Sequence, residues 1–421
     1  MSLLTLILQV ALSVFAEHPN RAGGNLCGYF PQDTTVSEAP KGYQPFYISH
    51  VARHGSRFLS KSSSDCFRVA DTLAVYAGKG MLTDEGLALW EDLKMLYGMS
   101  DGRFGSLTAL GAQEHRDICA RMVRHYPEVF SGPARRQVIT WSTISQRVQD
   151  SRAAFTDELT SRAPSVKIDE KVPQKSGTNS YALQEVTGIH LTKAERAAAA
   201  KEEKSFHKWA DLLRKGYDYN VFETRIFKDP AAIPAKTVKY IARESFKALK
   251  TGCVTDPATM PSIGKYFTSR ELYALWVGGT LSWARYLNFP GYVNPFTTAR
   301  GAILECIIRD ADEAVTLNSP VAATLRFSHD TYMLPLMASM KLEGTVLSCT
   351  EQEIPEYFQD YNFVCPACNV QLIFYRAGKN APILVKFLLN EKETLIHGLQ
   401  PLTGHYYEWS KVKKFWACYT R

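Results

Sequence analysis

Apolar runs that end in polar or charged residues recur along this chain of 421 residues. The apolar, β-branched and aromatic run from Pro45 to Val51 predicts a buried strand, and Gln137–Ser142 predicts a second. A short run over 323–327 predicts a third, and Val370–Arg376 with Pro382–Leu389 predicts a hairpin. Helical patterns follow most of these runs. The order predicts an α/β fold with a central mixed, mainly parallel sheet flanked by helices.

Between residues 165 and 300 the strand-like runs become rare and helical patterns dominate. Pro234–Leu249 predicts a helix that stops before Gly252, and the capping box Thr268–Glu271 predicts the start of another. We therefore expect residues 165–300 to form a mostly helical cap inserted into an α/β core made of residues 17–164 and 301–421.

A further capping box, Thr192–Glu195, opens a long Ala/Lys/Glu helix in the predicted cap. One interpretation of this helix is a basic wall that attracts a multiply phosphorylated substrate. The other is a solvated face of mixed charge, which its interspersed glutamates favour. The basic residues are Lys193, Arg196, Lys201, Lys204 and Lys208.

The chain starts with an almost unbroken apolar run, Leu3–Phe15, followed by Ala16. This resembles a secretory signal with cleavage after Ala16, although no Lys or Arg precedes the run. An uncleaved anchor or a misplaced start codon are the alternatives, and the run is short for a bilayer span. We expect an exported protein, whether periplasmic, outer-surface or secreted, without a stable membrane span.

The net charge of +7 and the pI of about 8.8 suit an anionic small substrate. They would also suit nucleic acid, but no Lys/Arg block stands out from its surroundings, which argues against that class of partner.

Nine cysteines make at least one of them free or paired between chains. Cys365-Pro366-Ala367-Cys368 precedes a strand-like run, whereas a thioredoxin-type motif would open a helix. A zinc site would need two more ligands at short spacing, and none is evident. A structural disulfide and two buried thiols remain open. We expect Cys119 and Cys306 to pack on apolar helix faces.

A cluster of polar side chains, Arg53-His54-Gly55-Ser56-Arg57, follows the first predicted strand. The C-terminal end of a parallel strand is where an open α/β sheet binds its ligand. The two guanidinium groups suit tetrahedral oxyanions, His54 suits a nucleophile or proton carrier, and Gly55 would let backbone approach the ligand closely. A surface loop with two solvated arginines is the alternative.

Two later strand ends repeat this arrangement. Arg147 follows the second predicted strand, at the start of a helix, and His329 and Asp330 follow the third. Taken alone, Arg147 could point into solvent and Asp330 could be a helix N-cap. Because parallel strands end at one edge of a sheet, the three segments together predict a single site.

The pattern Arg53-His54-Gly55-x-Arg57 resembles the signature of the histidine phosphatase superfamily, in its acid-phosphatase and phytase branch. Within it the chain is most similar to bacterial multiple inositol polyphosphate phosphatases, on Asn20–Asn25, Ala39–Tyr43, Ser49–Arg57 and Asn390–Glu393. The resemblance implies that His54 becomes a phosphohistidine, that Asp330 donates a proton to the leaving oxygen, and that phytate and lower inositol phosphates are substrates. It implies substrate contacts from Arg53, Arg57, Arg147 and His329, with no metal and no cofactor.

The chain departs from the family pattern at three places. Phe58 and Leu59 stand where a proline is frequent, and Ser328 stands where glycine is common. His329-Asp330-Thr331 replaces the His-Ala-Glu of the inositol polyphosphate branch, as in other acid phosphatases and phytases. The alternatives are therefore a broad acid or sugar-phosphate phosphatase, a phosphate-binding module without catalysis, and, less favoured, a phosphomutase.

Within the site, we expect one ring nitrogen of His54 to be held by a nearby backbone carbonyl such as that of Gly55. We also expect His329 to bind phosphate best when protonated, which would give an acidic optimum.

Overall fold

The structure is a computed structural model that describes residues 12–30, 35–131, 136–171, 212, 216–288, 295–316, 319–378 and 380–418. The helix predicted around residues 192–208 lies outside these ranges, so both interpretations of its basic side chains stay predictions.

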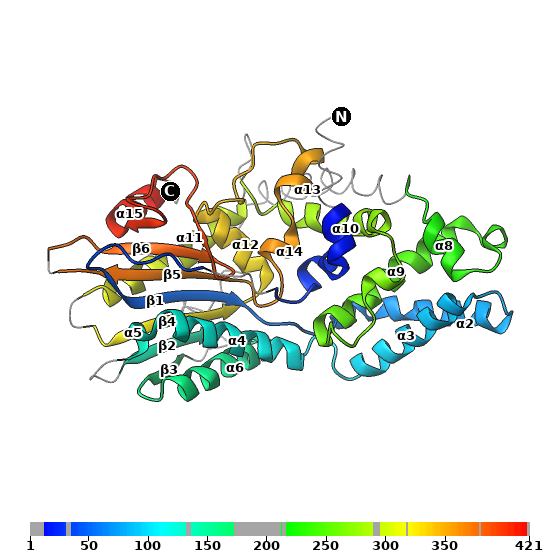
Figure 1. The fold of residues 1–421 in the computed structure, drawn as a ribbon, viewed down its shortest axis with the longest axis horizontal. Coiled ribbons are helices and arrows are strands. Elements are labelled where there is room, and N and C mark those ends of the chain that lie inside the picture. Colours follow the sequence, from blue (N-terminus) through cyan, green and yellow to red (C-terminus); the bar gives the residue numbers. More distant parts are fainter. Residues whose placement is uncertain are drawn as a thin grey trace.

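A mixed sheet organises the core (Figure 1). Four neighbouring strands run parallel, and the remaining strands pair antiparallel on one side of them. The predicted fold class, a mixed central sheet flanked by helices, is confirmed. In spatial order the strands are β3 (Lys167–Lys171), β2 (Gln137–Ser142), β4 (Val321–Ser328), β1 (Gln44–Arg53), β5 (Asn369–Arg376), β6 (Leu384–Leu389) and β7 (Lys392–Thr394), with β8 (Tyr406–Glu408) also paired to β6.

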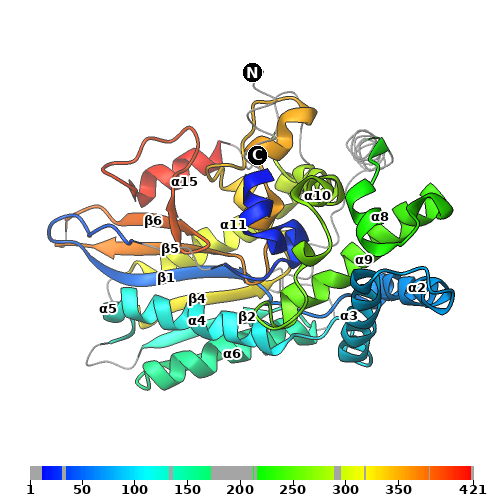
Figure 2. The same ribbon diagram turned by 45° about the vertical axis from the view of Figure 1, so that its right-hand side comes forward.

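Helices cover both faces of this sheet, as Figure 2 shows. One face carries α4 (Ala109–His125), α5 (Pro127–Phe130) and α6 (Gln146–Arg162). The other carries α11 (Pro295–Ala314), α12 (Asp330–Ser339) and α15 (Trp409–Ala417). The strands are buried from both sides, which explains their near-continuous apolar sequences. From Ile48 to Arg53, for example, every residue of β1 is buried.

A helical region lies beside the sheet, on the right in Figure 1. Its main helices are α2 (Val69–Gly78), α3 (Asp84–Ser100), α8 (Asn220–Ile226), α9 (Ala235–Thr255) and α10 (Ser269–Ala284). Helices α8, α9 and α10 come from the predicted insertion, whereas α2 and α3 come from upstream and pack against α9. The start of the predicted insertion forms β3, which pairs with β2.

Short helices connect these elements. They are η1 (Pro19–Leu26), η2 (Lys61–Arg68), η4 (Pro230–Ala232), η5 (Ile263–Lys265), η6 (Glu351–Glu353), α13 (Ile354–Tyr357) and α14 (Asp360–Phe363).

The helix starts follow the capping chemistry of the sequence. The side chain of Thr108 accepts a hydrogen bond from the N–H of Gly111 at the start of α4. The predicted capping box of Thr268 and Glu271 opens α10. The predicted end of α9 is wrong, because this helix continues past Gly252 to Thr255. A Cβ at Gly252 would lie 2.7 Å from the carbonyl oxygen of Pro261, so this glycine serves close packing and not helix termination.

The residues just before the predicted cleavage site pack against the helical region. Phe15 is buried, and its ring centroid lies 5.2 Å from that of Trp276 and 6.1 Å from that of Tyr361. Among the described residues, no helix is both long and apolar enough to cross a membrane.

Two histidines are buried in the apolar layer between the sheet and helices α4 and α6. The ring of His50, on β1, lies 5.2 Å from Phe155 and 5.9 Å from Phe327, and His115, on α4, lies 5.5 Å from Phe327. Neither ring nitrogen of His50 has a hydrogen-bond partner among the described residues. Burial lowers the pKa of both imidazoles to about 3. This placement gives His115 a structural role.

We predict that these histidines make the protein sensitive to acid. Because the folded state lowers their pKa from 6.5 to about 3, the unfolded state binds protons first as the pH falls. Their contribution to stability is complete above pH 6.5 and is lost progressively between pH 6.5 and pH 3. In His50→Leu, the loss of unfolding free energy between pH 7 and pH 4 should be smaller than in wild type by about 2 to 3 kcal/mol.

Urea unfolding at several pH values measures this difference. His397→Gln, at an exposed histidine, is the control and should leave the pH dependence unchanged. An identical pH dependence in wild type and His50→Leu would contradict the prediction.

Candidate active site

The end of β1 presents His54 at the edge of the parallel sheet. Its backbone N–H donates to the carbonyl of Ser328 (2.9 Å), which ties the end of β1 to that of β4. Its Nδ1 lies 2.8 Å from the carbonyl oxygen of Gly55, the contact expected from the sequence. No described residue hydrogen-bonds Nε2. A proton on Nδ1, donated to Gly55, leaves the lone pair on Nε2.

The end of β4 places a second histidine beside the first. Arg53 and Ser328 are paired in register, so His54 and His329 follow on adjacent parallel strands, with ring centroids 5.4 Å apart. Nη2 of Arg147 lies 3.3 Å from Nδ1 of His329, and Oγ1 of Thr143 lies 3.2 Å from its Nε2. Because a guanidinium can only donate, Nδ1 accepts and the ring is the neutral Nε2–H tautomer.

The end of β2 supplies Thr143 and Arg147. Ser142 is paired with Phe327 of β4, so the segment after β2 lies beside that after β4. Arg147 is the second residue of α6, where its half-buried side chain reaches His329. Three adjacent parallel strands therefore bring all six residues selected from the sequence into one site.

Three guanidinium groups give this site a strong positive charge. Nη2 of Arg53 lies 2.9 Å from Oδ2 of Asp330, and Nη1 of Arg57 donates to the carbonyl of Phe58 (2.8 Å). The Nε atoms of all three arginines are buried without a hydrogen-bond partner among the described residues. Burial and the charge of Arg53 lower the pKa of Arg57 to about 10, and burial lowers that of Arg147. Unsatisfied donors around a positive centre favour an anion.

The arginine charges also lower the pKa of both imidazoles of the site. Burial lowers the pKa of His54 well below 6.5, and the charges of Arg53 and Arg147 lower it further. Burial and Arg147 lower the pKa of His329 to about 4, which the carboxylate of Asp330 only partly opposes. In the unliganded site both rings are therefore neutral near pH 6.

Asp330 is the acidic group of the site. Burial raises the pKa of this carboxyl, but Arg53 and Arg57 outweigh burial, so the net shift is downward. Its Oδ2 accepts from the side-chain amide of Asn25 (3.1 Å), and its Oδ1 accepts from the N–H of Thr331 (2.9 Å). The carboxylate is thus ionised at neutral pH and fixed in orientation by these donors.

Buried groups below the site hold the loop after β1. The carboxylate of Glu114, on α4, accepts from the backbone N–H groups of Tyr29 and Ser56 and from the Ser56 hydroxyl. A Cβ on Gly55 would collide with the backbone of Gly111, also on α4. Gly55 is therefore needed for close packing of helix against loop, a role that the sequence did not predict.

The Cys365–Cys368 loop forms main-chain hydrogen bonds to the same end of β1 from its other side. The N–H of Arg53 donates to the carbonyl of Cys368 (2.9 Å), and the N–H of Ala367 donates to that of His54 (2.9 Å). Arg53 also donates through Nη1 to the carbonyl of Val364. All four sulfur atoms of Cys119, Cys306, Cys365 and Cys368 are buried free thiols, so the disulfide alternative is not realised here.

The sequence did not single out three of these residues. Asn25 donates to Asp330 and accepts from Arg53 through its carbonyl oxygen (2.6 Å). Thr143 contacts His329, and Glu114 holds Ser56. The position of Thr143 directly after the second predicted strand is a sequence signal that this residue lies at the site. Asn25 belongs to the Asn20–Asn25 segment that carries the family resemblance, and that segment implies no role for it.

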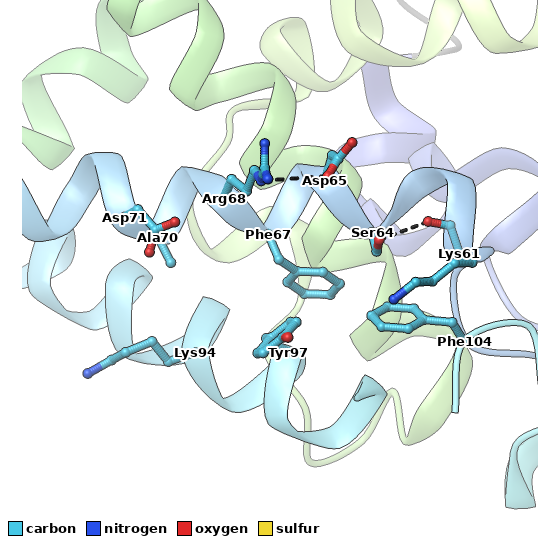
Figure 3. Close-up of a pocket in the computed structure, with 10 residues that line it drawn as sticks. All are labelled: Lys61, Ser64, Asp65, Phe67, Arg68, Ala70, Asp71, Lys94, Tyr97 and Phe104. Atoms are coloured by element: carbon cyan, nitrogen blue, oxygen red, sulfur yellow. Dashed lines mark hydrogen bonds and ion pairs between the residues drawn. The ribbon is translucent and has the colours of Figure 1, made fainter. Parts of the chain in front are cut away.

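Two of the cavities that the described residues form lie in or beside the helical region. The larger, of 370 Å³, is bounded by η2, α2 and α3 (Figure 3). Aromatic rings of Phe67, Tyr97 and Phe104 line it, with Lys61 above the ring of Phe104. The second, of 150 Å³, lies between η1, α9 and α10 and includes Asn25. Neither contains His54. Within the described residues, no group of three or more His, Cys, Asp or Glu is arranged to hold a metal ion.

Comparison with known proteins identifies the fold. No protein-family model matches the chain. No curated protein matches it either. Among solved structures, the multiple inositol polyphosphate phosphatase of Bifidobacterium longum, in complex with inositol hexasulfate, has a TM-score of 0.72 at 17% identity, over 95% of this chain and 98% of that one. The phytase from D. castellii has a TM-score of 0.73 at 15% identity, over 94% and 84%. The Hafnia alvei phytase, in complex with myo-inositol hexakis sulphate, has a TM-score of 0.57 at 13% identity, over 91% and 98%.

The chain has the fold of these phosphatases. This agrees with the resemblance to the acid-phosphatase and phytase branch of the histidine phosphatases, which the sequence suggested from its short motifs. At these identities the similarity establishes the fold, and the chemistry has to be argued from the residues of this chain.

We predict that Arg147→Met weakens binding of inorganic phosphate at least about tenfold, because a charge-assisted hydrogen bond contributes about 1.5 to 3 kcal/mol. Isothermal titration calorimetry at pH 5.5 and moderate salt measures this change. The control is Arg152→Met, which removes the same charge from the same helix. Arg152 pairs with Glu170 (2.8 Å), away from His329. Equal affinities in Arg147→Met and Arg152→Met would contradict the proposed contact.

Proposed function

We propose that this protein is a phosphomonoesterase that hydrolyses inositol polyphosphates such as phytate through a phosphohistidine intermediate. The observation that carries the proposal is a neutral His54, with Nδ1 held by Gly55, beside three guanidinium groups whose buried Nε atoms have no partner in the part of the chain that the structure describes. A nucleophile without charge next to a cluster of cationic hydrogen-bond donors suits phosphoryl transfer.

In the first half-reaction Nε2 of His54 attacks phosphorus. A P–N bond forms, the bond from phosphorus to the ester oxygen breaks, and Asp330 gives its proton to the departing alkoxide. Arg53, Arg57, Arg147 and His329 bind the equatorial oxygens, where negative charge accumulates. In the second half-reaction water attacks the phosphohistidine, Asp330 takes a proton from that water, and phosphate leaves.

The protonation of Asp330 follows from substrate binding. On their own, Arg53 and Arg57 hold the pKa of its carboxyl low. A phosphate dianion between the same guanidinium groups opposes their effect and raises this pKa, and it likewise raises that of His329. The proton donor and the protonated His329 are then populated in the complex at mildly acidic pH, which supports an acidic optimum.

A polyphosphorylated substrate is supported by charge next to the site. Arg243, Lys247 and Lys250, on one face of α9, line the cavity that Asn25 also lines. Inositol hexasulfate, the ligand named for the Bifidobacterium longum and Hafnia alvei structures, carries many anionic groups. A broad acid or sugar-phosphate phosphatase is the second candidate, because His329 is followed directly by Asp330.

Phosphate release from phytate and from an aryl phosphate, between pH 4 and 7, tests the function. We expect activity on both with a strong preference for phytate. His54→Ala should reduce activity by at least about a thousandfold, since it removes the nucleophile. His397→Ala, at an exposed histidine, should retain full activity.

Activity on the aryl phosphate alone would assign the protein to the general acid phosphatases. Binding of phytate without release of phosphate would instead assign it to the non-catalytic binding proteins.

We also propose that the chain is exported and cleaved after Ala16, on the basis of the apolar run Leu3–Phe15. Cleavage there would remove the contact of Phe15 with Trp276. N-terminal sequencing of the protein from a cell that exports it tests this proposal. A mature chain that begins at Glu17 is expected, and an intact N-terminus would contradict it.

A further inference from the structure

Ser151 carries a buried hydroxyl on α6 that the proposed mechanism does not use. It lies one turn after Arg147 and is fully buried. Its hydroxyl donates to the carbonyl oxygen of Arg147 (2.8 Å), a contact that serines inside helices often make. Its Oγ also accepts from the backbone N–H of Gly55 (3.1 Å). Because the single hydroxyl proton is used within α6, the oxygen serves the loop after β1 as an acceptor.

The N–H of Gly55 lies directly beside the contact that orients the nucleophile. It belongs to the peptide group between His54 and Gly55, whose carbonyl accepts from the N–H of Ala367 (2.9 Å). Ser151 and Ala367 therefore fix this peptide group at both of its polar ends. The following carbonyl, that of Gly55, lies 2.8 Å from Nδ1 of His54. The peptide group that Ser151 holds thus leads directly into the carbonyl that holds the imidazole.

Gly55 depends on such contacts, because glycine has the widest choice of backbone angles. A stiffer residue cannot take its place, since a Cβ there would collide with the backbone of Gly111. The peptide group after Gly55 is held at the N–H of Ser56, which donates to the carboxylate of Glu114 (2.7 Å). The peptide group before it is held at its N–H by Ser151. Helices α4 and α6 therefore each fix one side of the glycine.

The arginines of the site are held by contacts that do not depend on the hydroxyl of Ser151. Arg53 is the last residue of β1, which pairs with β4. Arg57 forms a β-bridge with Leu107. Arg147 belongs to α6, whose main-chain hydrogen bonds hold its backbone. Loss of the Ser151 hydroxyl should therefore affect the nucleophile more than the guanidinium groups.

We propose that Ser151 is a positioning residue for the nucleophile: through Gly55, it holds the imidazole of His54 in line with phosphorus. The proposal rests on the proposed function, because it assigns a role within that reaction. Without this hydroxyl the N–H of Gly55 is buried with no acceptor, and the peptide group is free to rotate. The Gly55 carbonyl then moves relative to Nδ1. The ring loses the contact that keeps its proton on Nδ1 and its lone pair on Nε2.

The expected signature is a loss of rate without a loss of phosphate binding. In-line attack takes place only in the transition state, whereas the guanidinium groups also bind phosphate in the ground state. We expect Ser151→Ala to lower kcat on 4-nitrophenyl phosphate about tenfold and to change the dissociation constant of inorganic phosphate less than about twofold. Phosphate-release assays measure the first value. Isothermal titration calorimetry measures the second, and its stoichiometry gives the folded fraction.

Thr156→Val is the matched control on the same helix. Thr156 is also buried, and its hydroxyl donates to the carbonyl oxygen of Ala153 (3.1 Å), within α6. The variant removes a buried hydroxyl from α6 and leaves the contact of Ser151 with Gly55 in place. Its kcat and its phosphate affinity should both equal those of wild type.

A second measurement locates the proton on His54 without turnover. Nitrogen NMR of isotope-labelled histidine distinguishes the two neutral tautomers, and the signals of His54 are those that disappear in His54→Ala. The wild type should carry the proton on Nδ1. Ser151→Ala should show a larger share of the tautomer with the proton on Nε2, which a purely structural defect elsewhere would not produce.

Ser151→Cys is the second variant, for the case in which Ser151→Ala does not fold. Its thiol forms weaker hydrogen bonds, so it should show the same pattern with a smaller amplitude. Unchanged kcat and an unchanged tautomer in a folded variant would overturn the positioning role, as would equal losses in Ser151→Ala and Thr156→Val. An inactive wild type would instead contradict the proposed function, and the tautomer of His54 would still test the contact through Gly55.

Discussion

Three guanidinium groups, those of Arg53, Arg57 and Arg147, meet the single carboxylate of Asp330 at the ends of the parallel strands. Burying cations without matching anions is costly, so the protein must hold them by other means. Backbone carbonyls of Asn25, Val364 and Phe58 accept part of their hydrogen bonds. Asp330 pairs with Nη2 of Arg53, and His329 accepts from Nη2 of Arg147. The Nε atoms of all three arginines are buried without a hydrogen-bond partner among the described residues, and such donors favour an anion. Because the fold already holds these donors in place, anion binding does not carry the cost of ordering them.

Strand pairing made this site predictable from the sequence. Once three apolar runs are recognised as parallel strands, their C-terminal ends must lie together, whatever the length of chain between them. His54 and His329 are far apart in sequence, yet the register between β1 and β4 places them side by side. Local chemistry also predicted the helix start at Thr268, because capping depends on neighbours within one turn.

Contacts between distant loops could not be predicted in this way. Asn25 reaches Asp330 across 305 positions, and no periodic pattern encodes that distance. The glycines show the same limit. Gly252 looks like a helix stop, but the nearby backbone of Pro261 makes it a packing residue within α9. At Gly55 the close approach of the Gly111 backbone is a packing requirement that no sequence pattern predicts. The sequence shows where a glycine stands. The residue that packs against it in the fold shows why a glycine is needed there.

Acid acts on this protein in two opposing ways. In the proposed reaction the complex gains from protons on Asp330 and His329, whose pKa values the bound phosphate raises. The fold loses stability over the same range, because buried His50 and His115 resist protonation to about pH 3, while the unfolded chain takes up protons from about pH 6.5 downward. The bound substrate controls the pKa values of Asp330 and His329. Burial in the apolar layer of Phe155 and Phe327 controls those of His50 and His115. Substrate binding also stabilises the folded state. It therefore offsets the stability that the protein loses at the mildly acidic pH where Asp330 and His329 need their protons. Mildly acidic pH is therefore the range in which the chemistry and the fold are compatible.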